Sequence, residues 1–125
     1  MSYVFPIHEI PVLSVAGTED VFPVHRIYCV GQNYFEHMYE MGSTPQRDAP
    51  FFFKKPADAV LHQNSQVYYP SATKNLHHEI ELVVAIGEKG TEISKSAALN
   101  HVFGYTVGLD SVSYTHLTLP TSDLV

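Results

Sequence analysis

The sequence contains a single cysteine, Cys29, so the chain cannot form an internal disulfide. Cys29 lies in the apolar run 27–30, which favours a small buried side chain over a reactive thiol. There is also no apolar run near the roughly 18 residues that a membrane-spanning helix needs. The first nine residues lack a basic cluster and are interrupted by Pro6, which argues against a signal peptide. These absences predict a soluble, cytoplasmic protein.

Basic residues are few and scattered. Seven Lys and Arg residues stand against thirteen Asp and Glu residues, which gives a formal net charge of −6. Nucleic acids and anionic membranes are bound by clustered basic side chains, so we expect neither of them as a partner.

The residues that are present indicate a folded chain. Of its 125 residues, 45% are hydrophobic and 16% are charged, as in globular proteins, and the length suits one domain with a modest core. Apolar runs that end at Gly or Pro predict short strands and helices. We expect a lead-in segment at 1–23 with a turn at 16–20, strands at 24–30, 51–55, 66–69, 79–86 and 102–109, and helices at 33–41 and 94–99.

The most informative stretch is 77–87, which is apolar and β-branched from Ile80 onward and reads as a buried strand. Side chains alternate along a strand, so Glu79 and Glu81 point to the same face. Neighbouring carboxylates repel each other and resist desolvation, and a hard cation such as Mg²⁺ relieves both costs. The alternative is an edge strand whose two glutamates are solvated.

The predicted strand 102–109 leads into Asp110. Gly104, Thr106 and Gly108 share the face of Asp110, and such small residues leave space for a ligand to approach the carboxylate. The alternative is close packing of the sheet, with Asp110 in a solvated turn.

His37 and Glu40 are three residues apart on the predicted helix 33–41, so their side chains emerge on one face. A carboxylate beside an imidazole raises its basicity, as a general base requires, although such pairs are also common on helix surfaces. His77 shares the face of Glu79, but a hard cation prefers oxygen ligands, so we do not expect His77 to bind it.

Several motifs together resemble the fumarylacetoacetate hydrolase family. They occur in the family's order at 27–34 (IYCVGQNY), 36–37 (EH), 50–56 (PFFFKKP), 75–82 (NLHHEIEL) and 104–110 (GYTVGLD). The opening segment and 51–60 are most similar to the bacterial fumarylpyruvate hydrolases of gentisate breakdown. The resemblance implies an α+β, mainly β fold, the family's mixed β-sandwich roll. It covers the N-terminal part of that roll, so we expect a truncated catalytic domain over 24–110.

The resemblance also implies an active site. Glu79, Glu81 and Asp110 would bind Mg²⁺, or Mn²⁺, and a His37–Glu40 dyad would activate water. The implied reaction is metal-dependent cleavage of a carbon–carbon bond in a 2,4-dioxo acid, with fumarylpyruvate giving fumarate and pyruvate. Two further residues, Lys55 and Gln32, are assigned to substrate binding; many family members have Arg where Gln32 stands, which weakens that contact.

The residues after Asp110 depart from the family. The segment 111–125 is rich in hydroxyl residues and lacks the family's later Lys and Gly/Thr/Pro-rich loop, so it reads as a non-family tail from a lost reading frame. Other possible activities are those of an oxaloacetate decarboxylase or a dienedioate isomerase. An alternative outside the enzymes is an inactive, non-catalytic fragment. We expect the complete protein, of which this chain would be the N-terminal part, to be a homodimer.

Overall fold

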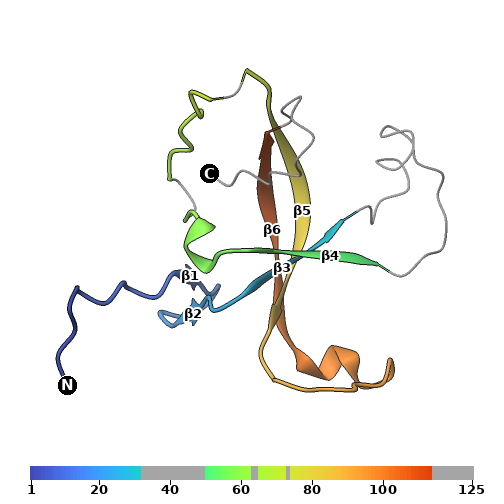
Figure 1. Cartoon of the computed structure of the whole chain (residues 1–125). Helices are drawn as coiled ribbons and strands as arrows, with labels where there is room; N and C mark the ends of the chain where they lie inside the picture. Colours follow the sequence, from blue (N-terminus) through green and yellow to red (C-terminus); the bar gives the residue numbers. More distant parts are fainter. Residues whose placement is uncertain (32–49, 63–64, 73, 114–125) are drawn as a thin grey trace. The chain divides into compact units, whose positions relative to one another are not determined.

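The computed structural model describes residues 1–31, 50–62, 65–72 and 74–113 (Figure 1). It divides into two compact units, Met1–Val67 and Tyr68–Val125. The strands form separate two-stranded antiparallel sheets, joined by loops that include the short 3₁₀ helices η1 (Ala57–Ala59) and η2 (Ala98–His101). This confirms the prediction of a mainly β chain. Within these ranges, no helix is long and apolar enough to cross a membrane.

The first unit begins with a small hairpin inside the predicted lead-in segment. Strand β1 (Val12–Ser14) pairs with β2 (Val21–Pro23), and the predicted turn connects them. Gly17 has a φ of +78°, a left-handed conformation that glycine adopts without steric cost. The hydroxyl of Thr18 accepts a hydrogen bond from the backbone N–H of Asp20 at 3.0 Å, which closes the turn.

Strand β3 (Ile27–Gly31) pairs with β4 (Phe51–Lys55) in the same unit, and the bounds predicted for the latter are confirmed. The strand predicted at 24–30 begins three residues late, because Val24 donates its N–H to the carbonyl of Pro11 at 2.8 Å instead of joining this ladder. Val24 is the one buried hydrophobic side chain in the described part of the chain, at 7% exposure. Cys29, expected to be buried, is half-buried.

The second unit contains the longest hairpin, a curved ribbon made of β5 (Leu76–Ile86) and β6 (Val102–Ser113) (Figure 1). Its register shifts between Ala85 and Ile86, and the loop beyond is closed by the Gly87 N–H, which donates to the carbonyl of His101 at 2.9 Å. The strand predicted at 102–109 runs four residues further, to Ser113. Residues 111–113 pair with His78, His77 and Leu76, since a backbone ladder continues wherever a partner strand is present.

Two other expected elements differ. Residues 66–69 form no strand, because the described residues offer them no partner strand to complete a ladder. The helix expected at 94–99 is a pair of tight turns followed by η2. The helix expected at 33–41 lies outside the described residues.

On the β5–β6 hairpin, the large apolar side chains are more exposed to solvent than the carboxylates, which is the opposite of what a buried apolar strand would show. One side, here called the apolar face, consists of Ile80, Leu82, Val84, Ile86, Tyr105, Val107 and Leu109, all exposed at 43% to 71%. The other side, here called the carboxylate face, consists of Glu79, Glu81, Val83, Ala85, Gly104, Thr106, Gly108 and Asp110. All of these except Thr106 are half-buried. The expectation of a buried strand is therefore wrong for the apolar side chains of β5.

Candidate metal centre

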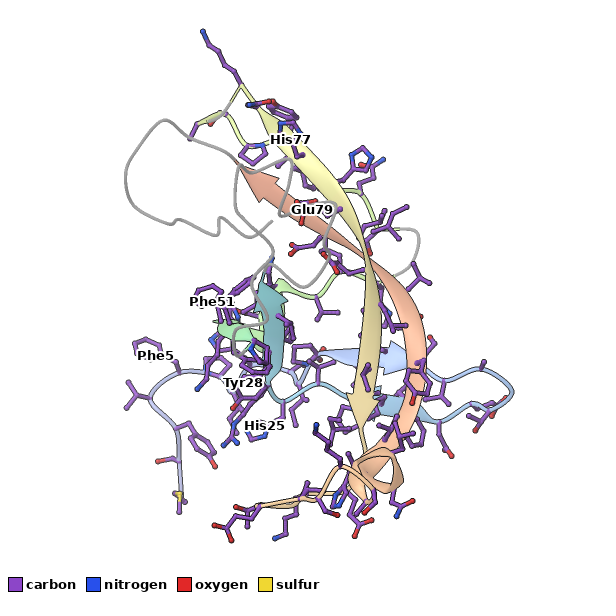
Figure 2. All side chains as sticks on the ribbon, turned by 90° about the vertical axis from the view of Figure 1, so that its right-hand side faces the viewer. Phe5, His25, Tyr28, Phe51, His77 and Glu79 are labelled. Carbon is purple, nitrogen blue, oxygen red and sulfur yellow. The ribbon has the colours of Figure 1, made fainter. Side chains whose placement is uncertain are left out.

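Strands β5 and β6 bring three carboxylates to one face of the hairpin. Glu79 and Asp110 are direct partners across the two strands, and Glu81 is the partner of Gly108. Direct partners in an antiparallel pair project to the same face, with Cβ atoms about 5 Å apart. Figure 2 labels His77 and Glu79, which follow one another along β5. The register therefore joins the two sequence motifs that end in these acids.

These three side chains are half-buried, which raises the free energy needed to keep their carboxyl groups ionised. Like charges directly opposite each other across a sheet also destabilise the pair. A hard divalent cation offsets both effects, and carboxylate oxygens are the ligands that Mg²⁺ and Mn²⁺ prefer. The donor set therefore fits such a cation in its chemistry.

The side chains of these residues are not arranged around a common point. Among the described residues, no three His, Cys, Asp or Glu side chains form a group that could hold a metal ion as they stand. The backbone register nevertheless makes Glu79 and Asp110 direct partners. The assignment of Glu79, Glu81 and Asp110 as ligands stays a prediction.

The glycines on the carboxylate face have different surroundings. A Cβ at Gly108 would lie 2.9 Å from Cγ2 of Val83, so any larger residue there would require the Val83 side chain to shift. A Cβ at Gly104 would meet no atom within 4 Å. Close packing, the alternative considered from the sequence, thus applies at Gly108, the glycine nearer to Asp110, whereas the open space lies at Gly104, six residues before the acid.

The contact between His77 and Asn75 was not expected from the sequence. The imidazole Nε2 of His77 lies 2.8 Å from Oδ1 of Asn75, so with a proton on Nε2 the ring donates to the amide. This hydrogen bond orients the imidazole next to Glu79 on the same face of β5. In the sequence, the only sign of this contact was that Asn75 and His77 are two residues apart, just before Glu79.

Four other predicted site residues lie outside the β5–β6 hairpin in the sequence. Lys55 is half-buried at the end of β4, where its cross-strand partner is Ile27, and β4 belongs to the first unit. Its neighbour Lys54 has Nζ 5.4 Å from the ring centroid of Tyr28, a cation–π contact. The catalytic pair His37 and Glu40 and the substrate residue Gln32 lie outside the described residues.

Comparison with known proteins identifies similar chains. The family model described as "Fumarylacetoacetate (FAA) hydrolase C-terminal" matches residues 26–118. The crystal structure of fumarylpyruvate hydrolase from Pseudomonas aeruginosa in complex with Mn²⁺ and pyruvate superimposes with a TM-score of 0.84 at 47% identity. That match covers 89% of this chain and 49% of the other.

Two curated relatives are mitochondrial enzymes. The oxaloacetate tautomerase of Bos taurus is 43% identical over 84 residues, which cover 67% of this chain and 38% of that protein. The oxaloacetate decarboxylase of Dictyostelium discoideum is 39% identical over 89 residues, covering 70% and 40% respectively. The chain thus spans less than half the length of these relatives.

Proposed function

Because the chain belongs to the fumarylacetoacetate hydrolase family, we propose that it carries the metal-binding part of an enzyme that hydrolyses a carbon–carbon bond of a 2,4-dioxo acid. The observation that carries the proposal is the register of β5 and β6, which puts Glu79, Glu81 and Asp110 on one half-buried face. The proposed substrate is fumarylpyruvate, on the strength of 47% identity to a fumarylpyruvate hydrolase.

Glu79, Glu81 and Asp110 would hold Mg²⁺ or Mn²⁺. When bound, the cation supplies a Lewis acid that stabilises negative charge developing on the substrate oxygens. The similar P. aeruginosa enzyme was crystallised with Mn²⁺ and pyruvate, and pyruvate is one product of the proposed reaction.

His37 and Glu40 are proposed to activate water. An imidazole nitrogen of His37 takes a proton from water, whose oxygen attacks the distal carbonyl carbon of the dioxo acid. The bond between that carbon and the neighbouring methylene breaks, and its electron pair leaves on the pyruvate enolate. Protonation of the enolate carbon gives pyruvate, and the acyl part leaves as fumarate. Glu40 orients His37 and stabilises its protonated form.

Lys55 and Gln32 are proposed to bind the substrate. The ammonium group of Lys55 would offset the charge of a dianionic acid, and the neutral amide of Gln32 would donate a weaker hydrogen bond to a carboxylate than a guanidinium does.

A chimaera tests the proposal. Residues 26–113 of this chain would replace the matching region of the P. aeruginosa enzyme, and loss of fumarylpyruvate would be followed with Mn²⁺ present. Turnover that disappears on substituting Glu81→Gln but survives Glu88→Gln in the exposed turn supports the assignment. Equal turnover in all three proteins removes the carboxylate face from the mechanism.

A second candidate activity acts on oxaloacetate, as the names of the two mitochondrial relatives suggest. Tautomerisation or decarboxylation of oxaloacetate would use the same metal ligands, since its 2-oxo acid group chelates a cation in the same way. Supplying the chimaera with oxaloacetate and with fumarylpyruvate in parallel separates the activities by their products. A dienedioate would be supplied as a third substrate, because dienedioate isomerisation is the other alternative activity considered from the sequence.

Several features of the complete protein belong to the same proposal. We propose a cytoplasmic location and a homodimer, with a small dioxo acid as the binding partner and no nucleic acid or membrane. The segment 1–23 remains assigned as a lead-in and 24–110 as the N-terminal part of the catalytic domain. Residues 111–125 remain assigned as a non-family tail, although the family match runs to residue 118.

A further inference from the structure

Two side-chain contacts hold the start of β5, just ahead of the carboxylates. The phenol oxygen of Tyr69 accepts a hydrogen bond from the backbone N–H of Leu76 at 3.3 Å. The imidazole Nε2 of His77 lies 2.8 Å from Oδ1 of Asn75. All four residues belong to the second unit, so both contacts lie within one compact body. Together they orient the backbone and the imidazole ring directly before Glu79.

The contact between Asn75 and His77 contributes orientation more than stability. Both side chains are exposed, and water satisfies exposed polar groups almost as well as a protein partner does. A histidine side chain on a strand has several staggered rotamers, and a hydrogen bond to a neighbouring amide selects one of them. The imidazole therefore has a defined direction on the face of the strand that it shares with Glu79 (Figure 2).

The same contact sets the tautomer of His77. The amide oxygen of Asn75 only accepts hydrogen bonds, so Nε2 carries the proton, and in the neutral ring Nδ1 is then an acceptor. An ionised carboxylate is also only an acceptor. The group that complements Nδ1 is therefore a donor other than Glu79 or Asp110. Water bound to a hard divalent cation is such a donor, because these cations keep several waters when carboxylates hold them.

The register puts His77 at the border of the three carboxylates. His77 precedes Glu79 by two residues on the carboxylate face, and its diagonal neighbour across the hairpin is Asp110. Diagonal neighbours have Cα atoms about 7–8 Å apart, which is still within reach of long or aromatic side chains. A hard cation prefers oxygen to nitrogen ligands, so the imidazole at this border favours a contact through water over direct ligation.

We propose that His77, oriented by Asn75, is a positioning residue that accepts a hydrogen bond from a water molecule bound to the divalent cation of the carboxylate face. The inference rests on the proposed function for the presence of that cation. It adds a role for a nitrogen that is not a metal ligand. Such outer hydrogen-bond partners change metal affinity by roughly 10- to 100-fold.

Titration of the full 125-residue chain with Mn²⁺ tests the proposal. His77→Ala should lower the affinity roughly 10- to 100-fold. Asn75→Ala should lower it less, because the imidazole remains but loses its fixed direction. His77→Gln should recover part of the loss, since an amide oxygen also accepts a hydrogen bond from water. His78→Ala is the matched control, because His78 is exposed on the opposite face, and the affinity should not change.

Electron spin-echo spectroscopy of the bound Mn²⁺ separates a contact through water from direct ligation. The expected spectrum of the unaltered chain shows no nitrogen bonded to the metal. A bonded nitrogen that disappears in His77→Ala would make His77 a ligand and overturn the proposal. Equal affinities of His77→Ala and the unaltered chain overturn it as well. So does a loss of affinity that His77→Gln does not reduce, because the role of the imidazole is then structural.

If circular dichroism shows that a variant of the chain is unfolded, the same substitutions would be made in the chimaera with residues 26–113. Metal binding is read out without catalysis, so the two proposals fail separately. Mn²⁺ affinity that depends on His77, without hydrolysis of any dioxo acid, would refute the proposed function and leave the positioning role standing. Hydrolysis with an Mn²⁺ affinity that is independent of His77 would refute the positioning role alone.

Discussion

Asp110 is the residue at which the register matters most, because it opposes Glu79 across the hairpin. Asp110→Asn keeps the size of the side chain but removes one of three negative charges. We expect the affinity of the chain for Mn²⁺ to fall at least tenfold, since even loss of an outer-shell partner of a metal site costs roughly 10- to 100-fold. Isothermal titration with Mn²⁺ measures this. Glu88→Gln, an exposed carboxylate in the turn, is the control and should bind as the unaltered chain does.

His37 is assigned to proton transfer and not to metal binding, and these two roles are separable. In the chimaera with residues 26–113, His37→Ala should lower kcat by about 100-fold or more, the usual contribution of a general base, with unchanged Mn²⁺ affinity. Steady-state kinetics beside metal titration reports both quantities. An unchanged kcat would remove the His37–Glu40 dyad from the mechanism.

At the scale of elements, the β5–β6 hairpin depends on close backbone approach at its end. A Cβ at Gly87 would lie 2.9 Å from Cβ of Phe103 and 3.4 Å from its Cα, and backbone at that distance does not move easily. Gly87→Ala should therefore destabilise the hairpin by about 1–3 kcal/mol, as overpacking does.

Gly104→Ala is the matched control in the same hairpin, because its Cβ would meet open space. Replacing a strand-interior glycine there should be neutral or stabilise by about 0.5–1 kcal/mol. Urea unfolding followed by circular dichroism compares the two variants. Equal midpoints would show that the contact with Phe103 relaxes without cost.

At the scale of the whole molecule, the described residues hold very little buried apolar surface. Val24 is their one buried hydrophobic side chain, while the apolar face of the hairpin is open. Burial of apolar area is the main favourable term in folding, so the free energy of unfolding of this chain should be small.

The expected consequence is that the 125-residue chain alone gives a flat progress curve with fumarylpyruvate and Mn²⁺, whereas the chimaera turns over. Excess EDTA should abolish turnover by the chimaera. Sustained turnover in EDTA would show that the reaction needs no divalent cation.

The sequence by itself determined part of the local structure, above all the strands around 51–55 and 79–86. The alternation in 77–87 put Glu79 and Glu81 on one face, and Pro56 ended β4 where the sequence predicted. These features depend on side-chain period and on residues that break ladders, which are local properties.

The tertiary structure decided the partners. Only pairing of distant strands places Asp110 opposite Glu79, extends β6 to Ser113 and leaves 66–69 without a ladder. It also decided which face of β5 is exposed. An alternating strand specifies two faces but not what covers either of them, because burial depends on segments far away in the sequence.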